Sequence, residues 1–172
     1  DKPYLSKENL GQDVPFLLQW TPSMVVTSDA GTGIGYTGMR LRGSDQTRIN
    51  VTINGIPLND SESQNVFWVN LPDLMSSVKN IQIQRGVGTS TNGAGAFGGT
   101  VSISTHDLRV NPYIDLSAGL GSFNTRKIQV SAGSGLINGK YFVEARSSLI
   151  KSDGYIDRAS ADLKSLYFSA GR

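Results

Sequence analysis

The feature that most constrains the fold of this chain is a sustained alternation of apolar and polar residues, which fills its last third from about residue 112 onward. Four alternating segments carry their apolar residues on one side, at Ile114, Leu116, Ala118, Leu120, Ile128, Val130, Ala132, Leu136, Tyr141, Val143, Ala145, Leu149, Leu166, Phe168 and Ala170. Successive side chains of a strand point to opposite faces, so the pattern predicts strands with one apolar face. Strands of about 9 to 11 residues with this pattern are typical of a membrane β-barrel.

The connections between these segments have two lengths. Asn138-Gly139 supplies the positive φ angles of a tight turn, whereas a polar loop over residues 152–161 precedes the fourth segment. Short turns on one side and longer loops on the other also fit a membrane barrel. A soluble β-sandwich shows alternation as well, because one face of each strand packs while the other is wet. Periodicity alone therefore leaves both architectures open.

Residues up to about 105 form short elements between glycine-rich stretches. A short helix is predicted around residues 14–19, ended by Pro22, and a second around residues 71–75. Short strands are predicted at residues 24–26, 39–42, 49–53, 81–85 and 101–105. Asn54-Gly55 is the strongest local turn signal, and 20 glycines against only 6 prolines favour turns and strands over helices. The predicted fold class is mainly β, with a mixed first part.

The composition excludes several classes of protein. With no cysteine and a single histidine, His106, the chain has no disulfide, no cysteinyl zinc site and no histidine cluster for a metal, and His106 is interpreted as a linker residue. The 16 basic and 14 acidic residues are scattered, so the chain lacks the basic stripe that nucleic acid requires. No pairing of a nucleophile with a base is recognisable. The sequence predicts no enzyme activity and no cofactor.

Two further patterns are better explained without a ligand. Residues 33–38 match the dinucleotide-binding pattern G-x-G-x-x-G, but the residues that follow alternate like a strand, whereas nucleotide binding needs a helix there. Asp45, Asp60 and Glu62 lack the dense spacing of a calcium loop and are interpreted as solvated loop acids.

Two pairs of segments carry a resemblance to a known family. Residues 40–43 (Arg-Leu-Arg-Gly) and 48–57 (Arg-Ile-Asn-Val-Thr-Ile-Asn-Gly-Ile-Pro) resemble the motif R-I-R-G … R-x-x-V-x-I-D-G-V-P of the plug domain of TonB-dependent outer-membrane receptors. Residues 78–86 and 93–105 are similar to the end of the same domain, I-E-R-I-E-V-x-R-G-P … Y-G-x-x-A-x-G-G-V-I-N-I-x-T. Order and spacing both agree, over about residues 10–106.

The chain departs from the family pattern at several positions. Asn54 stands where Asp is usual, Val87 where Pro is usual and Asn92 where Tyr is usual. Asn tolerates the same turn geometry as Asp, so the predicted turn is kept. Residues 54–68 and 86–99 look closest to receptors of Bacteroidetes type.

The resemblance implies two domains. Residues 1–106 are expected to form the plug, and residues 107–172 the first about four strands of a transmembrane antiparallel β-barrel of about 22 strands. An open sheet leaves backbone groups unpaired in hydrocarbon, so we expect this chain to be a fragment completed by several hundred further residues. The TonB box is not recognisable in residues 1–6 and is expected upstream.

The resemblance also implies a function, which is active, ligand-gated import across the outer membrane of a Gram-negative bacterium. The implied cargo is a scarce nutrient such as a ferric siderophore, a cobalamin, a peptide or a glycan. The implied partners are the TonB-ExbB-ExbD complex, outer-membrane lipid and a surface lipoprotein. The alternative is a soluble or surface-displayed β-rich binding protein without transport activity. Outer-membrane fractionation and heat-modifiable migration distinguish the two.

Two sets of residues are predicted to carry this function, and neither is a metal site. The resemblance places loops 44–48 and 59–70 at the extracellular apex of the plug. The ligand contacts predicted on these loops are Asp45, Gln46, Gln64, Phe67 and Trp68. Arginines at the motif positions of Arg42 and Arg85 pair with barrel glutamates in the family, so these two are expected to lock the plug to later barrel strands.

Overall fold

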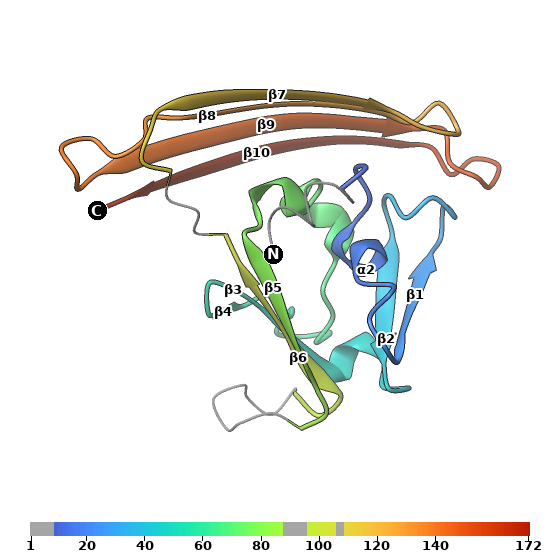
Figure 1. The fold of residues 1–172 in the computed structure, drawn as a ribbon. Coiled ribbons are helices and arrows are strands. Elements are labelled where there is room, and N and C mark those ends of the chain that lie inside the picture. The colour runs from blue at the N-terminus through green and yellow to red at the C-terminus, as the bar shows by residue number, and fades with distance from the viewer. Residues whose placement is uncertain (1–8, 88–95, 106–108) are drawn as a thin grey trace.

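The computed structural model describes residues 9–87, 96–105 and 109–172, which form two parts (Figure 1). The first part, which we call the N-terminal unit, ends at residue 105. The second part is a curved sheet of four antiparallel strands that lies over the N-terminal unit, and we call it the C-terminal sheet. The predicted domain boundary at 106/107 and the linker role of His106 fall outside the described residues.

The N-terminal unit contains two small sheets and a set of single-turn helices. A hairpin pairs β1 (Met24–Ser28) with β2 (Thr37–Leu41), and a mixed sheet has the order β4-β3-β6-β5. The mixed sheet comprises β3 (Ile49–Ile53), β4 (Ile56–Pro57), β5 (Asn80–Arg85) and β6 (Gly99–Ser104), with β3 and β6 parallel. The helices are α2 (Val14–Leu17), η1 (Gln46–Arg48), η2 (Trp68–Asn70) and η3 (Leu74–Ser77).

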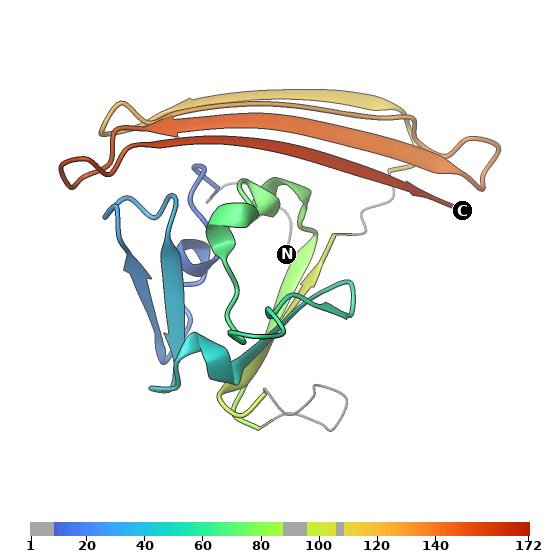
Figure 2. The same cartoon turned by 180° about the vertical axis from the view of Figure 1, so that it is seen from behind.

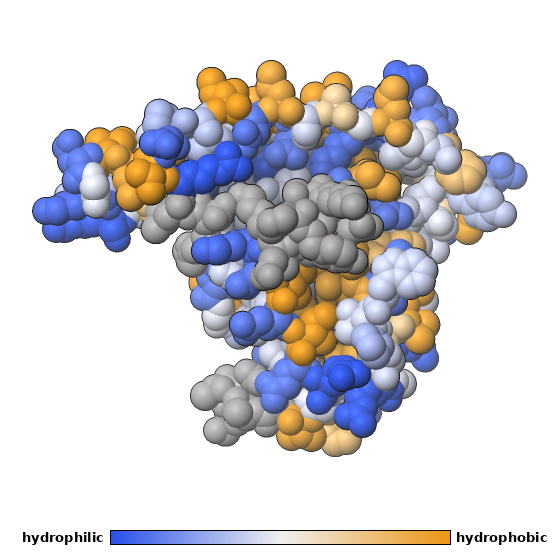
Figure 3. All heavy atoms as spheres, viewed as in Figure 1, coloured by the Kyte–Doolittle hydropathy of each residue, from blue (hydrophilic) through white to orange (hydrophobic). Residues whose placement is uncertain are grey.

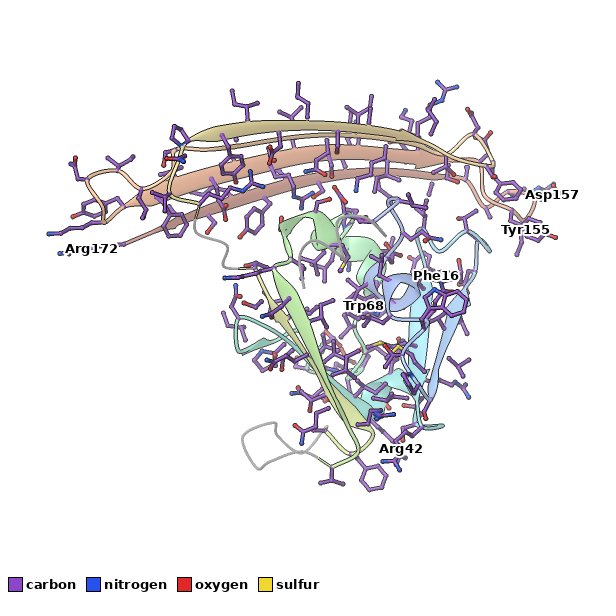
Figure 4. All side chains as sticks on the ribbon, viewed as in Figure 1. Phe16, Arg42, Trp68, Tyr155, Asp157 and Arg172 are labelled. Atoms are coloured by element: carbon purple, nitrogen blue, oxygen red, sulfur yellow. The ribbon has the colours of Figure 1, made fainter. Side chains whose placement is uncertain are left out.

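One hydrophobic core joins these elements. Ile49 and Val51 alternate inward on β3, and Val101 and Ile103 do the same on the neighbouring β6. Trp68 of η2 fills the centre of this core with 1% of its surface exposed (Figure 4). The core therefore holds η2, and the η3 turn that follows it, against the sheet.

The predicted turn at residues 54 and 55 is confirmed. Asn54 and Gly55 have φ angles of 50° and 83°, as a two-residue hairpin between β3 and β4 requires. The Asn54 side chain also donates to Thr105 Oγ1 at 2.8 Å and accepts the Thr105 backbone N–H at 3.0 Å. Asn54 thus ties the turn to the end of β6.

The C-terminal sheet has the strands that the alternation predicts. They are β7 (Tyr113–Leu120), β8 (Arg126–Gly133), β9 (Phe142–Ser152) and β10 (Ala161–Gly171), in the order β10-β9-β8-β7. β7 and β8, at 8 residues each, are shorter than expected, whereas β9 and β10 reach 11. The loops 121–125 and 153–160 lie at one end of the sheet, and the predicted Asn138-Gly139 turn lies at the other (Figure 1).

The two faces of the C-terminal sheet differ in chemistry. The face away from the N-terminal unit carries a row of exposed apolar side chains, visible in Figure 3 along the upper edge. Its members include Ile114, Leu116, Leu120, Ile128, Val130, Val143, Leu149, Leu166 and Phe168. The opposite face carries polar side chains and lies against the N-terminal unit, with η3 directly beneath it when seen from behind (Figure 2). Among the described residues, no helix is long and apolar enough to cross a membrane.

Two helix predictions need correction. The helix expected around residues 71–75 is instead the 3-10 turn η3, because Asp73 adopts a left-handed backbone with φ of 53° and helical geometry cannot begin before Leu74. The helix expected at 14–19 ends at Leu17. The G-x-G-x-x-G stretch leads into β2 rather than a helix, as predicted. Most of the glycine-rich loop predicted at 88–99 falls outside the described residues.

Candidate functional site

A buried carboxylate joins the N-terminal unit to the C-terminal sheet. Asp73, at the start of η3, is 2% exposed and reaches two cations of the sheet. Lys127 Nζ of β8 lies 2.6 Å from Asp73 Oδ1, and Arg146 Nη1 of β9 lies 2.9 Å from Asp73 Oδ2. Each carboxylate oxygen therefore has its own cation, which is the charge-assisted geometry expected of a strong ion pair.

Local structure brings these three residues together. The left-handed backbone of Asp73 places its side chain at the first turn of η3, on the side that faces the sheet. Lys127 and Arg146 occupy inward positions of adjacent strands, since Lys127 pairs with Ile150 and Arg146 pairs with Ser131 in the register of β8 and β9. Both cations are nearly buried, at 7% and 5% exposed.

Serine hydroxyls complete the hydrogen bonding of this group. Ser76 Oγ donates to Asp73 Oδ1 at 2.6 Å and accepts from Lys127 Nζ at 3.1 Å. The guanidinium of Arg146 donates to Ser77, Ser148 and Ser165 at 2.8, 3.2 and 3.3 Å. We call Asp73, Ser76, Ser77, Lys127 and Arg146 the Asp73 cluster. Its polar groups are satisfied, as burial of charge demands.

The Asp73 cluster carries one more positive charge than negative charge, because two cations share one carboxylate. Removing one partner of a buried ion pair typically costs about 3 to 5 kcal/mol, since the remaining charge is stranded. Loss of Asp73 strands two cations at once. The cluster is therefore a strong and specific link, and separating the two parts of the chain requires energy.

A cavity of about 650 Å³ runs along this interface. At one end it is lined by Gly31 and Phe123, near the loops of the C-terminal sheet, and at the other end by Tyr113 and Tyr167. Lys127, Arg146, Ser76 and Ser77 line it in between. The wall of the sheet is polar here, with Gln129, Ser131 and Glu144 also facing the cavity.

Smaller contacts close both ends of the interface. The Tyr155 backbone N–H donates to the Ala30 carbonyl at 2.9 Å, and the Tyr155 ring packs edge-on against Phe123 at the loop end (Figure 4). At the opposite end, Tyr167 Oη donates to Thr105 Oγ1 at 3.4 Å. Among the described residues, the Asp73 cluster lies between these two contacts.

The structure separates the five residues predicted to contact a ligand. Asp45 accepts hydrogen bonds from the Thr47 hydroxyl and, at 3.0 Å, from the Thr47 backbone N–H, which caps η1. The hydroxyl first, and the backbone N–H second, hold the pKa of Asp45 below its ordinary value. Gln64 and Phe67 are exposed, Gln46 is half-buried, and Trp68 lies in the core with its ring inaccessible. Their role as a ligand-binding set stays a prediction.

Asp60, which was interpreted as a solvated loop acid together with Asp45, also has a structural role. It accepts the Ser63 backbone N–H at 2.7 Å and the Glu62 backbone N–H at 3.2 Å, which closes the turn after Asn59. Within the described ranges, no three His, Cys, Asp or Glu side chains are grouped so as to hold a metal.

Arg42 lies on the side of the N-terminal unit away from the C-terminal sheet (Figure 4), and Arg85 is the last residue of β5. A Cβ atom at Gly86 would sit 3.2 Å from Arg42 Nη1, so the Arg42 guanidinium lies beside the end of β5. No ion pair to either arginine is found among the residues that the structure describes. Their locking role therefore stays a prediction.

Sequence reasoning missed Asp73, Lys127 and Arg146. The signal available was a lysine and an arginine at inward positions of two alternating strands, where single charges are rare unless paired. Their partner lies 54 and 73 residues away, and no local pattern indicates it.

Comparisons with known proteins give a consistent result. A family model described as TonB-dependent Receptor Plug Domain matches residues 5–100. Hemoglobin-haptoglobin-binding protein A of Haemophilus influenzae is 27% identical over 147 residues, covering 76% of this chain and 14% of that protein.

Two solved structures share the fold. The FrpB iron transporter of Neisseria meningitidis superposes with a TM-score of 0.75 at 19% identity, over 97% of this chain and 27% of that one. The pyoverdine outer membrane receptor FpvA of Pseudomonas aeruginosa, bound to pyoverdine, gives 0.72 at 18% identity, over 94% and 23% of the two chains. The chain therefore spans about a seventh to a quarter of the length of these proteins.

Proposed function

This chain belongs to the TonB-dependent receptor plug domain family, and on that premise we propose that it is the first part of an active importer for a scarce nutrient. Residues up to about 105 are the plug, and β7–β10 are the first strands of the barrel that surrounds it. The observation that carries the proposal is the buried Asp73 cluster, which fastens the plug to the polar inner wall of the barrel.

The protein lies in the outer membrane of a Gram-negative bacterium. The apolar row on the outer face of β7–β10 suits contact with lipid, while the inner face is polar and meets the plug. We assign the end of the sheet with loops 121–125 and 153–160 to the outside of the cell, and the end with the Asn138-Gly139 turn to the periplasm. Connection length does not carry this assignment, because the connection over residues 134–141 is as long as loop 153–160 and longer than loop 121–125.

In the proposed cycle, cargo binds from outside and the plug blocks the barrel until energy is supplied. The TonB-ExbB-ExbD complex then pulls on a segment that precedes the plug. Moving the plug along the β7–β9 wall breaks the Asp73 cluster, at an expected cost of a few kcal/mol. In this proposal the link resists spontaneous opening, and the pull of the TonB complex breaks it. The receptor makes and breaks no covalent bond in this cycle.

An iron-carrying ligand is the first cargo class to test. The three proteins compared above are named for hemoglobin-haptoglobin, iron and pyoverdine. Cobalamin, peptide and glycan are the other classes that we propose. Asp45, Gln46, Gln64 and Phe67 are the proposed contacts on the plug, whereas the Trp68 ring contributes only if the core around it rearranges.

Uptake by cells tests this function. The full-length receptor is expressed in a strain lacking its own copy, and accumulation of radiolabelled ferric siderophores, haem iron and cobalamin is measured with and without TonB. We expect one cargo to accumulate only when both the receptor and TonB are present. Uptake that persists without TonB contradicts active import, and a receptor that fractionates outside the outer membrane contradicts the assignment as a whole.

A further inference from the structure

The charges of the Asp73 cluster come from different parts of the chain. The plug supplies the carboxylate, and the barrel wall supplies both cations, on β8 and β9. Ser148 and Ser165, which also belong to the wall, accept hydrogen bonds from Arg146 and hold its guanidinium in place. When η3 moves, the cations stay behind on the wall.

Without Asp73, Lys127 and Arg146 form a ready anion site. Their ammonium and guanidinium groups converge on one carboxylate, at 2.6 and 2.9 Å, so they are spaced for a carboxylate-sized anion. They lie on the wall of the 650 Å³ cavity, which runs from the loop end to the Tyr113 end of the plug–barrel interface. The nearby wall carboxylate, Glu144, accepts hydrogen bonds from Tyr113 and Tyr167. Two cations that have lost their carboxylate partner attract an anion.

We propose that Lys127 and Arg146 are an anion-binding station on the transport path. Asp73 occupies the station at rest, and a carboxylate or phosphate group of the cargo occupies it after η3 has moved. Exchange of one anion for another keeps the two cations paired, so the barrel wall never exposes a stranded charge. The inference rests on the proposed import function, since it assigns a step of transport to these residues.

The test asks whether small anions replace the Asp73 side chain. The full-length receptor with Asp73→Ala and Val51→Cys is purified. The reactivity of the introduced cysteine is measured as the temperature rises, and it reports unfolding of the plug. Val51 is 1% exposed in the plug core, and this chain has no cysteine of its own. Acetate, inorganic phosphate and chloride are titrated at equal ionic strength.

We expect acetate or phosphate, but not chloride, to raise the midpoint temperature saturably, by about 5 °C at tenfold the dissociation constant. The acetate and phosphate arms distinguish carboxylate-bearing from phosphate-bearing cargo. Adding Lys127→Gln and Arg146→Gln to Asp73→Ala must abolish the response. A midpoint that does not respond to either anion, or responds equally in the triple variant, overturns the proposal.

The exposed ion pair of Lys151 and Asp162 provides a matched control. Its atoms lie 2.8 Å apart, with both side chains more than half exposed. Asp162→Ala strands one lysine in water, and we expect no response to acetate; an equal response there means that the effect is not specific to the station. If the Asp73→Ala receptor does not assemble in cells, it is refolded from urea, and the yield of refolded receptor is measured in place of the midpoint temperature. A refolding yield that does not depend on the acetate concentration contradicts the proposal.

The outcome is separable from that of the proposed function. Anion binding is measured on purified receptor without TonB, whereas import is measured in cells with wild-type receptor. If wild-type receptor imports cargo but the Asp73→Ala variant does not respond to anions, the import function stands and the anion-binding station is contradicted. If the variant responds to anions but import does not depend on TonB, the anion site stands and the import function is contradicted.

Discussion

At Asp73, the backbone conformation and the side chain both contribute to the ion pairs with the barrel wall. Its left-handed φ of 53° delays the start of η3 and turns the carboxylate toward the barrel wall, where Lys127 and Arg146 meet it. The sequence predicted the link between plug and barrel with the opposite polarity, as Arg42 and Arg85 meeting barrel glutamates. The two arrangements are compatible, because they concern opposite sides of the plug.

A second buried carboxylate, Asp13, gives the plug a pH dependence. Burial raises the pKa of Asp13 from 3.8 to about 6, although Thr37 Oγ1, at 2.9 Å, and the Gly35 backbone donate to it and act in the opposite direction. The folded plug therefore binds more protons than the unfolded chain between these two values. The stabilising contribution is complete below pH 3.8 and is lost as the pH rises through about 6.

We expect Asp13→Asn to be more stable than wild type at pH 7.5, by up to about 3 kcal/mol, with the difference vanishing toward pH 4. The urea midpoint of the plug, read from the reactivity of Val51→Cys, measures this. A difference of the same size at both pH values would show that Asp13 acts through something other than its charge.

The predicted lock formed by Arg42 and Arg85 can be tested by mutation. If they pair with barrel glutamates on later strands, replacing both with alanine strands those acids, at a cost of about 3 to 5 kcal/mol for each buried pair. We expect more leak of a large antibiotic through receptors that insert at normal levels. Arg40→Ala with Lys79→Ala removes the same charge from exposed plug positions and serves as the control. Leak equal to that of the control means that Arg42 and Arg85 are ordinary strand-end cations.

At the scale of elements, alternation predicted the faces of β7–β10 correctly. Leu166 and Phe168 of β10 point outward with 81% and 67% of their surface exposed, while Tyr167 between them points to the plug. Period-2 patterns are local, so one sequence suffices to assign them. The helix at 71–75 was mispredicted because Asp73 has a left-handed backbone, which no periodicity in the sequence indicates.

Leu166→Arg tests the lipid-facing assignment. An arginine on the lipid face near the middle of the bilayer costs about 2 to 4 kcal/mol, so we expect less heat-modifiable receptor in the outer membrane. Ser169→Arg, three residues along on the inner face, pairs across the strands with Glu144 and should be tolerated. Equal assembly of both variants argues against a lipid-facing side at Leu166.

At the scale of the whole molecule, the sequence was sufficient for the plug and the first barrel strands but not for their contact. The motifs around Arg42 and Asn54 indicated the family, and the family match over residues 5–100 confirmed it. The Asp73 cluster joins residues 54 and 73 positions apart, which neither periodicity nor motif detects. Trp68 was predicted to face a ligand from its aromatic ring and from the place that the resemblance gives loop 59–70, whereas in the structure its ring lies in the plug core.

The central claim is that the plug must leave the β8 wall for cargo to pass. A Cβ atom at Gly11 would lie 3.8 Å from Lys127 Cβ, within the range of about 3.5 to 4.5 Å that a disulfide spans, so Gly11→Cys with Lys127→Cys can tie the start of the plug to the wall. Gly121→Cys with Thr125→Cys, at 3.5 Å, places a disulfide within the barrel only and is the matched control.

TonB-dependent uptake of the identified cargo is measured in oxidised and then reduced cells carrying each pair. Because the reduced Gly11→Cys/Lys127→Cys receptor also lacks the lysine, comparing its two redox states isolates the effect of the tether. We expect oxidation to stop uptake through this receptor and reduction to raise it to the level of a Gly11→Ser/Lys127→Ser receptor, which lacks the lysine and cannot be crosslinked. We expect the control pair to import at the same rate in both redox states. Unchanged uptake through a fully crosslinked Gly11→Cys/Lys127→Cys receptor would contradict the central claim.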